Sequence, residues 1–199
     1  MGIEAFGFQW PDTRKASAVL RDAGNIERWL AHTEKRRQCF QAGACVGVFP
    51  KALAAHFAEV WTVELAPDNF ACLLENGMPA NVHAFCGAVG EFRGRTGIQR
   101  ERLPISHYVG AGNDLPMLSV DGLGLTECDL IALDVEGYEW PALKGAVDTI
   151  KRCSPLLVIE TKGHGQRFGY TDAQMNGWIQ GLGYRLVERV GRDNVWTHD

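Results

Sequence analysis

The stretch CFQAGACVGVF, from Cys39 to Phe49, decides the fold. An apolar run ends in a turn that contains Gly43 and Gly47, and a helical pattern starts directly after it. Such a unit leaves the first N–H groups of the helix without intrahelical partners, so they can face a ligand at the strand end. Glycine in a turn of this kind is also common for structural reasons. Taken alone, the stretch indicates one strand–turn–helix unit of an α/β protein.

The same alternation of strand and helix continues along the chain. The predicted strands are residues 38–43, 60–65, 81–89, 129–135, 155–161, 184–191 and 194–198. The predicted helices are residues 48–57, 67–76, 141–151 and 171–182. Thr171 is the expected cap of the last helix and Gly183 its stop. The last two strands predict an antiparallel hairpin, so we expect an α/β fold with a doubly wound, mostly parallel sheet and an antiparallel edge.

The length of 199 residues is enough for one domain with a buried core, and we expect a single domain over residues 1–199. Residues 1–37 are expected to form a helical extension, with Asp12 and Asn25 as helix caps. Residues 91–116 contain four arginines and several glycines without clear periodicity. We expect an irregular insertion with room for a short strand, which is either a solvated loop or a lid that contacts the substrate or an anion.

Composition narrows the functional class. The net charge of −4 disfavours nucleic acid as a partner. The six cysteines are scattered without a CxxC pair, so we expect reduced thiols in a cytoplasmic protein rather than a disulfide framework or a zinc site. The N-terminus has no basic-then-apolar leader pattern, and no apolar run reaches membrane-span length. We therefore expect no membrane partner.

Glu64 ends the second predicted strand, about 20 residues after Gly43. At this distance an acidic side chain can accept hydrogen bonds from the two hydroxyls of a ribose. The turn lacks the middle glycine of the dinucleotide pattern, because Ala44 and Cys45 follow Gly43. A cofactor with a ribose but no pyrophosphate, such as S-adenosylmethionine, fits this turn better. A nicotinamide-dependent oxidoreductase and a non-catalytic nucleoside-binding module stay as alternatives.

Two longer stretches resemble the FkbM-type S-adenosylmethionine-dependent methyltransferases. They are CFQAGACVGVFPKALAAHFAEVWTVELAPDNFACLLEN, residues 39–76, and CDLIALDVEGYEWPALKGAVDTIKRCSPLLVIE, residues 128–160, whose sharpest part is Asp134–Glu139. The resemblance spans residues 36–197. It implies the class I methyltransferase fold, a Rossmann-like sheet of seven strands, and methyl transfer to a hydroxyl oxygen. The implied acceptor is a sugar or another small molecule.

The resemblance also implies a set of cofactor contacts. These are Gln41, Gly43, Ala44 and Gly47 for the methionine half, Glu64 for the ribose, Cys86, Gly87 and Ala88 near the adenine, and Asp134 beside the transferred methyl group. Related methyltransferases usually have Asp where this chain has Gln41. The chain therefore lacks one negative charge that can favour the methionine ammonium.

Transfer to an alcohol requires a group that takes the hydroxyl proton. Asp134 is the expected general base because it ends the fourth strand beside the cofactor. Glu160 and His164, at and after the end of the fifth strand, are the other candidates. A divalent cation held by Asp134, Glu136 and Glu160 is a further alternative, although no ligand spacing requires a metal.

Basic residues near the same strand ends bear on the choice of acceptor. Lys162, Arg167 and the arginines of residues 91–116 could bind an acceptor that carries an anionic group, such as an acidic or phosphorylated sugar. A solvated position fits these side chains equally well. The sequence therefore predicts a small-molecule or carbohydrate acceptor, either neutral or anionic.

Overall fold

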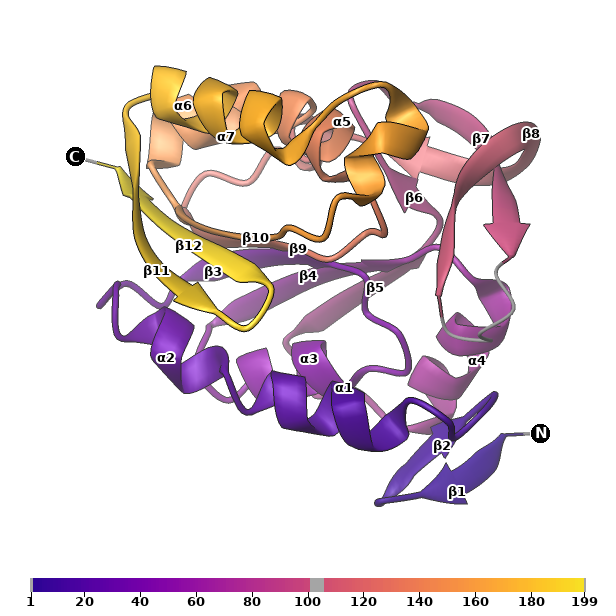
Figure 1. The fold of residues 1–199 in the computed structure, drawn as a ribbon. Coiled ribbons are helices and arrows are strands. Elements are labelled where there is room, and N and C mark those ends of the chain that lie inside the picture. Colours follow the sequence, from indigo (N-terminus) through magenta and orange to yellow (C-terminus); the bar gives the residue numbers. More distant parts are fainter. Residues whose placement is uncertain (1, 101–105, 199) are drawn as a thin grey trace.

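The computed structural model describes residues 2–100 and 106–198. Its central sheet has seven strands (Figure 1), in the spatial order β11 (Tyr184–Val190), β12 (Asp193–His198), β10 (Leu156–Glu160), β9 (Cys128–Leu133), β3 (Gln38–Ala42), β4 (Glu59–Glu64) and β5 (Val82–Cys86). Neighbouring strands are parallel, except that β12 is antiparallel to both β10 and β11. The predicted seven-stranded, mostly parallel sheet with an antiparallel C-terminal hairpin is confirmed.

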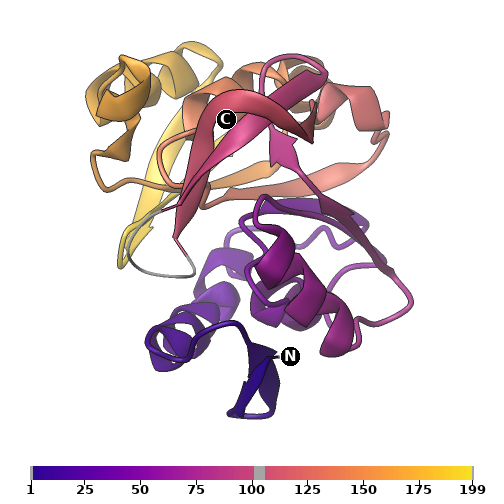
Figure 2. The ribbon, with the colours of Figure 1, turned by 90° about the vertical axis from the view of Figure 1, so that its right-hand side faces the viewer.

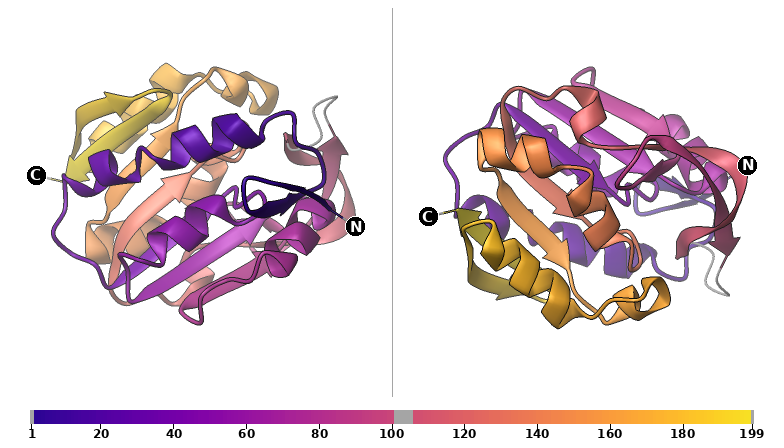
Figure 3. Two further views of the ribbon diagram at one scale, coloured as in Figure 1. Left: turned by 90° about the horizontal axis from the view of Figure 1, so that it is seen from below. Right: turned by 90° about the horizontal axis from the view of Figure 1, so that it is seen from above.

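Helices cover both faces of this sheet (Figure 3). One face carries α1 (Ala16–Ala23), α2 (Ile26–Leu30), α3 (Val48–Leu53) and α4 (Pro67–Glu75). The other face carries α5 (Glu139–Lys144), α6 (Val147–Cys153), α7 (Asp172–Gly181) and the short 3-10 turns η1 (Asp121–Leu123) and η2 (His164–Phe168). None of the described helices is long and apolar enough to cross a membrane.

Each central strand sends alternate side chains into two separate apolar clusters. Phe40 and Ile131 belong to the cluster that includes side chains of α5, α6 and α7. Their neighbours Cys39 and Leu130 belong to the cluster that includes side chains of α2 and α3. All four side chains are fully buried. Burial on both faces explains why these strands are nearly continuous apolar runs in the sequence.

Most of the insertion is a β-hairpin rather than an irregular loop (Figure 2). β7 (Gly94–Arg100) pairs antiparallel with β8 (His107–Leu118), and β6 (Ala88–Val89) pairs in parallel with β8. The expectation of an irregular insertion with at most a short strand therefore underestimated the regular structure of the described part. Many of the hairpin's residues are exposed or half-buried, so its sequence lacks the alternation of apolar and polar residues that identifies a strand.

The first 37 residues are not wholly helical, in contrast to the sequence-based expectation. β1 (Ile3–Ala5) and β2 (Phe8–Trp10) form an antiparallel pair, and the Trp10 side chain is fully buried. Three-residue strands are too short to give a periodic signal, which explains why the sequence did not reveal them.

The two expected caps of this region do not act as caps. α1 begins at Ala16, and the Asp12 carboxylate instead accepts hydrogen bonds from the backbone N–H of Arg14 at 2.8 Å and from its guanidinium at 3.0 Å. Asn25 does precede α2, but its side chain makes no capping hydrogen bond. The short Asp12–Arg14 pair satisfies the carboxylate locally, so the helix starts later than predicted.

The predicted helix over residues 141–151 is divided into α5 and α6. Asp121 provides the physical reason, because its carboxylate accepts hydrogen bonds from the N–H groups of Asp148 at 3.1 Å and Thr149 at 2.7 Å. These bonds satisfy the free N–H groups of a new helix start. The last helix agrees with the prediction. Thr171 caps α7 through a capping box with Gln174, and Gly183 follows the helix with a φ of +89°.

Gly43 joins the two strands that lie at the centre of the sheet. A Cβ atom at this position would lie 1.9 Å from the backbone oxygen of Asp134, and the φ angle of Gly43 is +87°. In addition, the N–H of Asp134 donates to the carbonyl oxygen of Ala42 at 3.1 Å. Only glycine permits both this backbone angle and this approach. The turn after β3 and the turn after β9 are therefore packed directly against each other.

Gly43→Ala is expected to destabilise the protein by about 3 kcal/mol or more, because the new methyl group would require a backbone shift in both turns. Chemical denaturation of the purified variant measures this loss. Gly177→Ala in α7 is the matched control: its added Cβ would meet no atom within 4 Å. That control is expected to be neutral or stabilising by up to about 1 kcal/mol. Equal stabilities for the two variants would contradict the proposed constraint.

Candidate functional site

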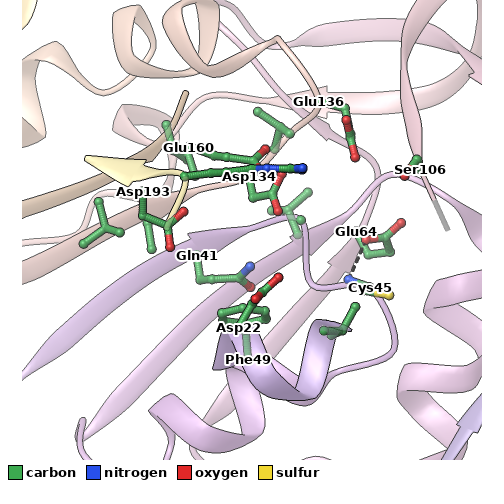
Figure 4. Close-up of a pocket in the computed structure, with 18 of the residues that line it drawn as sticks. Asp22, Gln41, Cys45, Phe49, Glu64, Ser106, Asp134, Glu136, Glu160 and Asp193 are labelled. Atoms are coloured by element: carbon green, nitrogen blue, oxygen red, sulfur yellow. Dashed lines mark hydrogen bonds between the residues drawn. The ribbon is translucent and has the colours of Figure 1, made fainter. Parts of the chain in front are cut away.

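A cavity of about 600 Å³ lies at the carboxyl ends of the central strands (Figure 4). Its lining includes Gln41 of β3, Glu64 of β4, Asp134 after β9, Glu160 of β10 and Asp193 of β12. Strand order reverses between β3 and β9, because the chain proceeds from β3 toward β5 on one side and from β9 toward β10 on the other. Small-molecule sites of doubly wound sheets lie at such a reversal.

The first N–H groups of the turn after β3 donate hydrogen bonds to other groups of the protein. The N–H groups of Gly43 and Ala44 donate to the carbonyl oxygen of Val63 at 3.0 and 3.1 Å. The N–H of Cys45 donates to Glu64 Oε2 at 2.8 Å, and Cys45 has a φ of +51°. The turn is therefore tied to the end of β4, and the cavity is lined here by Gly43 and Cys45.

Glu64 is a buried carboxyl group with three hydrogen-bond donors around it. Oε1 accepts from the N–H of Ala66 at 2.9 Å and from the amide of Asn69 at 3.0 Å, and Oε2 accepts from Cys45. Burial raises the pKa of Glu64 to about 7, although the three hydrogen bonds oppose this shift. An oxygen can accept two hydrogen bonds, so Oε2 keeps one acceptor position for a hydroxyl group.

Gln41 is almost fully buried at 3% exposure and lines the cavity. Its amide oxygen accepts a hydrogen bond from the hydroxyl of Thr62 on β4. The amide NH2 group consequently has the donor role toward the cavity (Figure 4). A donor suits a carboxylate or a hydroxyl oxygen of a ligand better than it suits an ammonium.

The carboxyl group of Glu139 holds the turn after β9, residues 134–139, in place. Glu139 Oε1 accepts from the N–H of Val135 at 3.0 Å and from the N–H of Gly137 at 3.1 Å. The hydroxyl of Tyr170 donates to the carbonyl oxygen of Gly137 at 2.7 Å. A Cβ on Gly137 would lie 2.5 Å from the carbonyl oxygen of His164, and its φ is +103°. Gly137 therefore lets η2 approach this turn, and Glu139 is a structural carboxyl group.

Lys162 lies among three carboxyl groups of the cavity. Its Nζ is 2.6 Å from Glu160 Oε2, 3.1 Å from Glu136 Oε2 and 3.5 Å from Asp134 Oδ1. Although burial opposes the charge, Asp134, Glu160 and Glu136 raise the pKa of Lys162. The side chains of Lys162, Glu136 and Glu160 are 15%, 16% and 8% exposed, whereas Asp134 is 53% exposed. Asp134 is thus the most accessible carboxylate of the group.

The carboxyl groups of Asp134 and Glu160 shift each other's pKa. Burial and the neighbouring Asp134 raise the pKa of Glu160 far above its usual range. Burial also opposes ionisation of Asp134, but a hydrogen bond with Glu160 and the charge of Lys162 hold its pKa below the ordinary value. Within the pair, the surroundings therefore favour ionisation of Asp134 and disfavour ionisation of Glu160.

Asp134, Glu139 and Glu160 offer oxygen atoms within 4.8 Å of one another, a spacing that a metal ion can use. Lys162 competes with any such ion, because its Nζ already lies against two of these carboxyl groups. An ammonium and a divalent ion about 4 Å apart repel by about 8 kcal/mol at an effective dielectric constant near 20. The residues present therefore supply a fixed cation of their own.

His164 is positioned differently from the other two catalytic candidates. Its Nδ1 lies 2.9 Å from Glu136 Oε2, and the ring is not among the residues that line the cavity. The glutamate has a positive φ of +56°, which is strained for a residue with a side chain. Of the three candidates, Asp134 and Glu160 face the cavity, and His164 supports Glu136.

The cofactor candidates divide in the same way. Gln41, Gly43, Glu64, Ala88 and Asp134 line the cavity, as does Gly87. Three candidates, Ala44, Gly47 and Cys86, are not among the lining residues. Gly47 instead precedes α3, where an added Cβ would lie 2.6 Å from Met78.

Three of the arginines considered for an anionic acceptor have partners within the protein. Arg95 donates to the carbonyl oxygens of Asn113 and Asp114, at 2.8 and 3.0 Å. Arg100 pairs with Asp68 at 2.8 Å. Arg167 donates to the carbonyl oxygen of Glu136 at 3.3 Å and lies over the ring of Tyr108. Arg102 lies outside the described residues.

Two acidic residues of the cavity were not among the predicted site residues. Asp193 begins β12 and pairs in register with Glu160, and Asp22 comes from α1 (Figure 4). Burial and the nearby charges of Asp134 and Asp22 raise the pKa of Asp193 to about 7. Because β12 is antiparallel to β10, its first residue lies at the same sheet edge as the last residue of β10. Asp193 could have been predicted from this rule. Asp22 could not, because it lies on a helix that packs over the sheet from outside it.

Comparison with known protein families identifies the domain. The model of the Methyltransferase FkbM domain matches residues 41–186. The chain belongs to this family. The match covers β3 to the middle of β11, and thus all the cavity residues discussed above except Asp22 and Asp193. No match was found among curated proteins.

Solved structures share the fold of this FkbM domain. A methyltransferase FkbM from Methylobacillus flagellatus has a TM-score of 0.57 and 19% identity, over 82% of this chain but only 44% of that chain. The TehB-like S-adenosylmethionine-dependent methyltransferase from Corynebacterium glutamicum has a TM-score of 0.54 and 17% identity, over 93% and 92%. This FkbM domain therefore spans less than half of the first structure.

The N-methyltransferase NodS from Bradyrhizobium japonicum has a TM-score of 0.55 and 13% identity, over 94% of this chain and 97% of that chain. Its complex with S-adenosyl-l-homocysteine matches with a TM-score of 0.50 and 13% identity, over 89% and 83%. At these identities the likeness establishes the fold of this FkbM domain, which is that of class I methyltransferases.

Glu139→Gln is expected to make the FkbM domain less sensitive to pH. Burial raises the pKa of Glu139 from 4.5 to about 7, so the stability that the neutral carboxyl contributes is lost as pH rises through 7. Gln keeps the oxygen that accepts from Val135 and Gly137. Between pH 5 and 8 the wild type should therefore lose about 2 kcal/mol relative to the variant.

Denaturation of both proteins at several pH values measures this difference. The exposed Glu75→Gln on α4 is the control, and its stability should follow the wild type at every pH. Parallel curves for wild type and Glu139→Gln would show that Glu139 does not titrate in this range.

Proposed function

We propose that this chain is an S-adenosylmethionine-dependent methyltransferase that transfers a methyl group to a hydroxyl oxygen of a small polar acceptor, such as a sugar. The observation that carries the proposal is the placement of Glu64 and Asp134 on one cavity, at strand ends on either side of β3. One carboxyl group suits the ribose hydroxyls, and the other suits the reacting end of the ligand.

The residues of the cavity fit this cofactor. When bound, S-adenosylmethionine supplies an electrophilic methyl group on a sulfonium. The free acceptor position on Glu64 Oε2 would hold a ribose hydroxyl, Gly87 and Ala88 would lie at the adenine, and the amide of Gln41 would hold the methionine carboxylate. The S-adenosyl-l-homocysteine bound in the NodS structure, a protein of the same fold, supports this choice.

Two observations favour Asp134 as the group that takes the proton from the acceptor hydroxyl. Its side chain is accessible in the cavity, whereas Glu160 is 8% exposed and burial raises its pKa, which disfavours its ionised form. His164 does not line the cavity. Asp134 is therefore the proposed general base, Glu160 and Lys162 are its supporting groups, and Glu136 and His164 form a supporting pair behind Lys162.

The family match favours a methyl donor over a nicotinamide cofactor. The structure adds a physical reason, because Cys45 places a side chain at the middle position of the turn, where a pyrophosphate needs glycine. No saturable NADH binding is expected in a fluorescence titration.

Binding of S-adenosyl-L-homocysteine tests the cofactor directly. The ligand is expected to raise the melting temperature and to bind in calorimetry, because it binds only the folded state. Glu64→Gln should weaken this binding about tenfold or more, since it replaces a carboxylate acceptor with an amide. The control is Glu59→Gln at the other end of β4, with unchanged affinity. A folded wild type that binds no ligand at millimolar concentration would refute the cofactor.

Asp134→Asn tests the catalytic role. Transfer of a labelled methyl group into the small-molecule fraction of a cell extract should fall at least about 100-fold, because Asn cannot take the hydroxyl proton. Affinity for S-adenosyl-L-homocysteine should stay within about threefold. The control is Asp148→Asn, an exposed position on α6, with wild-type transfer. Wild-type transfer by Asp134→Asn would remove Asp134 as the base, and no transfer by the wild type would favour a binding module.

A further inference from the structure

Lys162 has an unusual position for a lysine side chain. Its ammonium lies inside the cavity wall, with 15% of the side chain exposed, and contacts Glu160, Glu136 and Asp134. Lysine is rarely buried, because removing its charge from water is costly unless carboxylates compensate. Here the compensation comes from both strand ends that frame the proposed reacting centre, β9 through Asp134 and β10 through Glu160.

We propose that Lys162 is a catalytic residue that binds the acceptor oxygen beside Asp134 and acts as the built-in cation of the site, in the role that a divalent metal ion has in metal-assisted methyl transfer. This inference rests on the proposed methyl transfer and names the group that activates the acceptor hydroxyl.

The three contacts of Lys162 differ in a way that suits this role. The contacts with Glu160 at 2.6 Å and Glu136 at 3.1 Å are short, and these side chains are largely buried. The contact with Asp134 is 3.5 Å, longer than an ordinary charged hydrogen bond, and Asp134 is half exposed. The two short contacts hold the ammonium in place. An acceptor hydroxyl entering from the cavity can therefore donate to Asp134 and accept from Lys162.

The chemical step follows from this arrangement. The acceptor oxygen forms a bond to the methyl carbon while the carbon–sulfur bond breaks, and the electron pair of the broken bond stays on sulfur. The hydroxyl proton passes to the carboxylate of Asp134. Lys162 keeps its proton throughout and stabilises the negative charge that grows on the acceptor oxygen.

The same ammonium explains how a weak base can act here. Lys162 helps to hold the pKa of Asp134 low, which makes the carboxylate a poor proton acceptor for an ordinary alcohol. An alcohol oxygen in contact with Lys162 is itself more acidic, because the cation favours its ionised form. The ammonium thus weakens Asp134 as a base, but it also makes the acceptor hydroxyl easier to deprotonate, so the two effects offset each other.

A binding experiment tests the position of the charge without any acceptor. Sinefungin carries an amine in place of the methyl sulfonium, whereas S-adenosyl-L-homocysteine is neutral at that point. Calorimetry compares both ligands in wild type, in Lys162→Met and in Lys151→Met, an exposed lysine on α6. In Lys162→Met the carboxylates lose their counter-charge, so sinefungin should gain about tenfold over S-adenosyl-L-homocysteine. In Lys151→Met the ratio should not change.

An activity experiment tests the catalytic role. Transfer of labelled methyl into the extract fraction that the wild type uses should fall about 100-fold or more in Lys162→Met, with affinity for S-adenosyl-L-homocysteine within about threefold. Added methylammonium should restore part of the rate, and Lys162→Arg should retain more activity than Lys162→Met because it keeps the charge. Wild-type transfer should be unchanged by a chelator such as EDTA.

Lys162→Met leaves buried carboxylates without their partner and can fail to fold. The double variant Lys162→Met/Glu136→Gln removes one charge of each sign and repeats both measurements. An unchanged ligand ratio in folded Lys162→Met, wild-type activity in Lys162→Met or in the double variant, or chelator-sensitive wild-type transfer would overturn the role of Lys162. If the folded wild type binds neither ligand, the proposed cofactor itself fails, and Lys162 falls with it.

Discussion

The direct packing of Gly43 against the backbone oxygen of Asp134 is the constraint on which the site depends. It joins the turn after β3 to the turn after β9, and the hydrogen bond between Asp134 and Ala42 supports it. Because Cys45 in the same turn donates to Glu64, the end of β4 is tied to this junction as well. Three strand ends are thus fixed relative to one another by backbone contacts and by the side chain of Glu64. The carboxyl groups of Glu64 and Asp134 are consequently held at set positions on one cavity.

Charge organises the rest of the cavity. Asp134, Glu136 and Glu160 converge from two strand ends, and such a group would be unstable if every member were ionised and unpaired. Lys162 supplies one positive charge, and burial together with Asp134 disfavours ionisation of Glu160, so the group carries less negative charge than its composition implies. The arrangement leaves Asp134 ionised and accessible, which is the state that the proposed chemistry requires. Its charge balance comes from the protein's own side chains.

Much of the fold and part of the site could be predicted from local signals. The strands that cross the core are continuous apolar runs, and Glu64, Asp134 and Glu160 follow from their positions at strand ends. The predictions were wrong where a strand has no periodic pattern, or where two residues have the same position relative to a strand end. Strands that are short or exposed on both sides, as in β1, β2, β7 and β8, lack a periodic pattern. His164 follows a strand end as Lys162 does, but only one of them faces the cavity.

The sequence by itself determined the alternation of strands and helices, the family resemblance and the strand-end positions of the main acidic residues, because these depend on local periodicity and on motifs. Tertiary structure decided which side chains meet. The contact of Lys162 with three carboxyl groups, the arrival of Asp22 from α1 and the hydrogen bonds of Arg95 and Arg167 to backbone carbonyls all depend on distances between segments far apart in the chain. Such distances are set by packing, and pKa values follow from them, so neither can be read from local sequence.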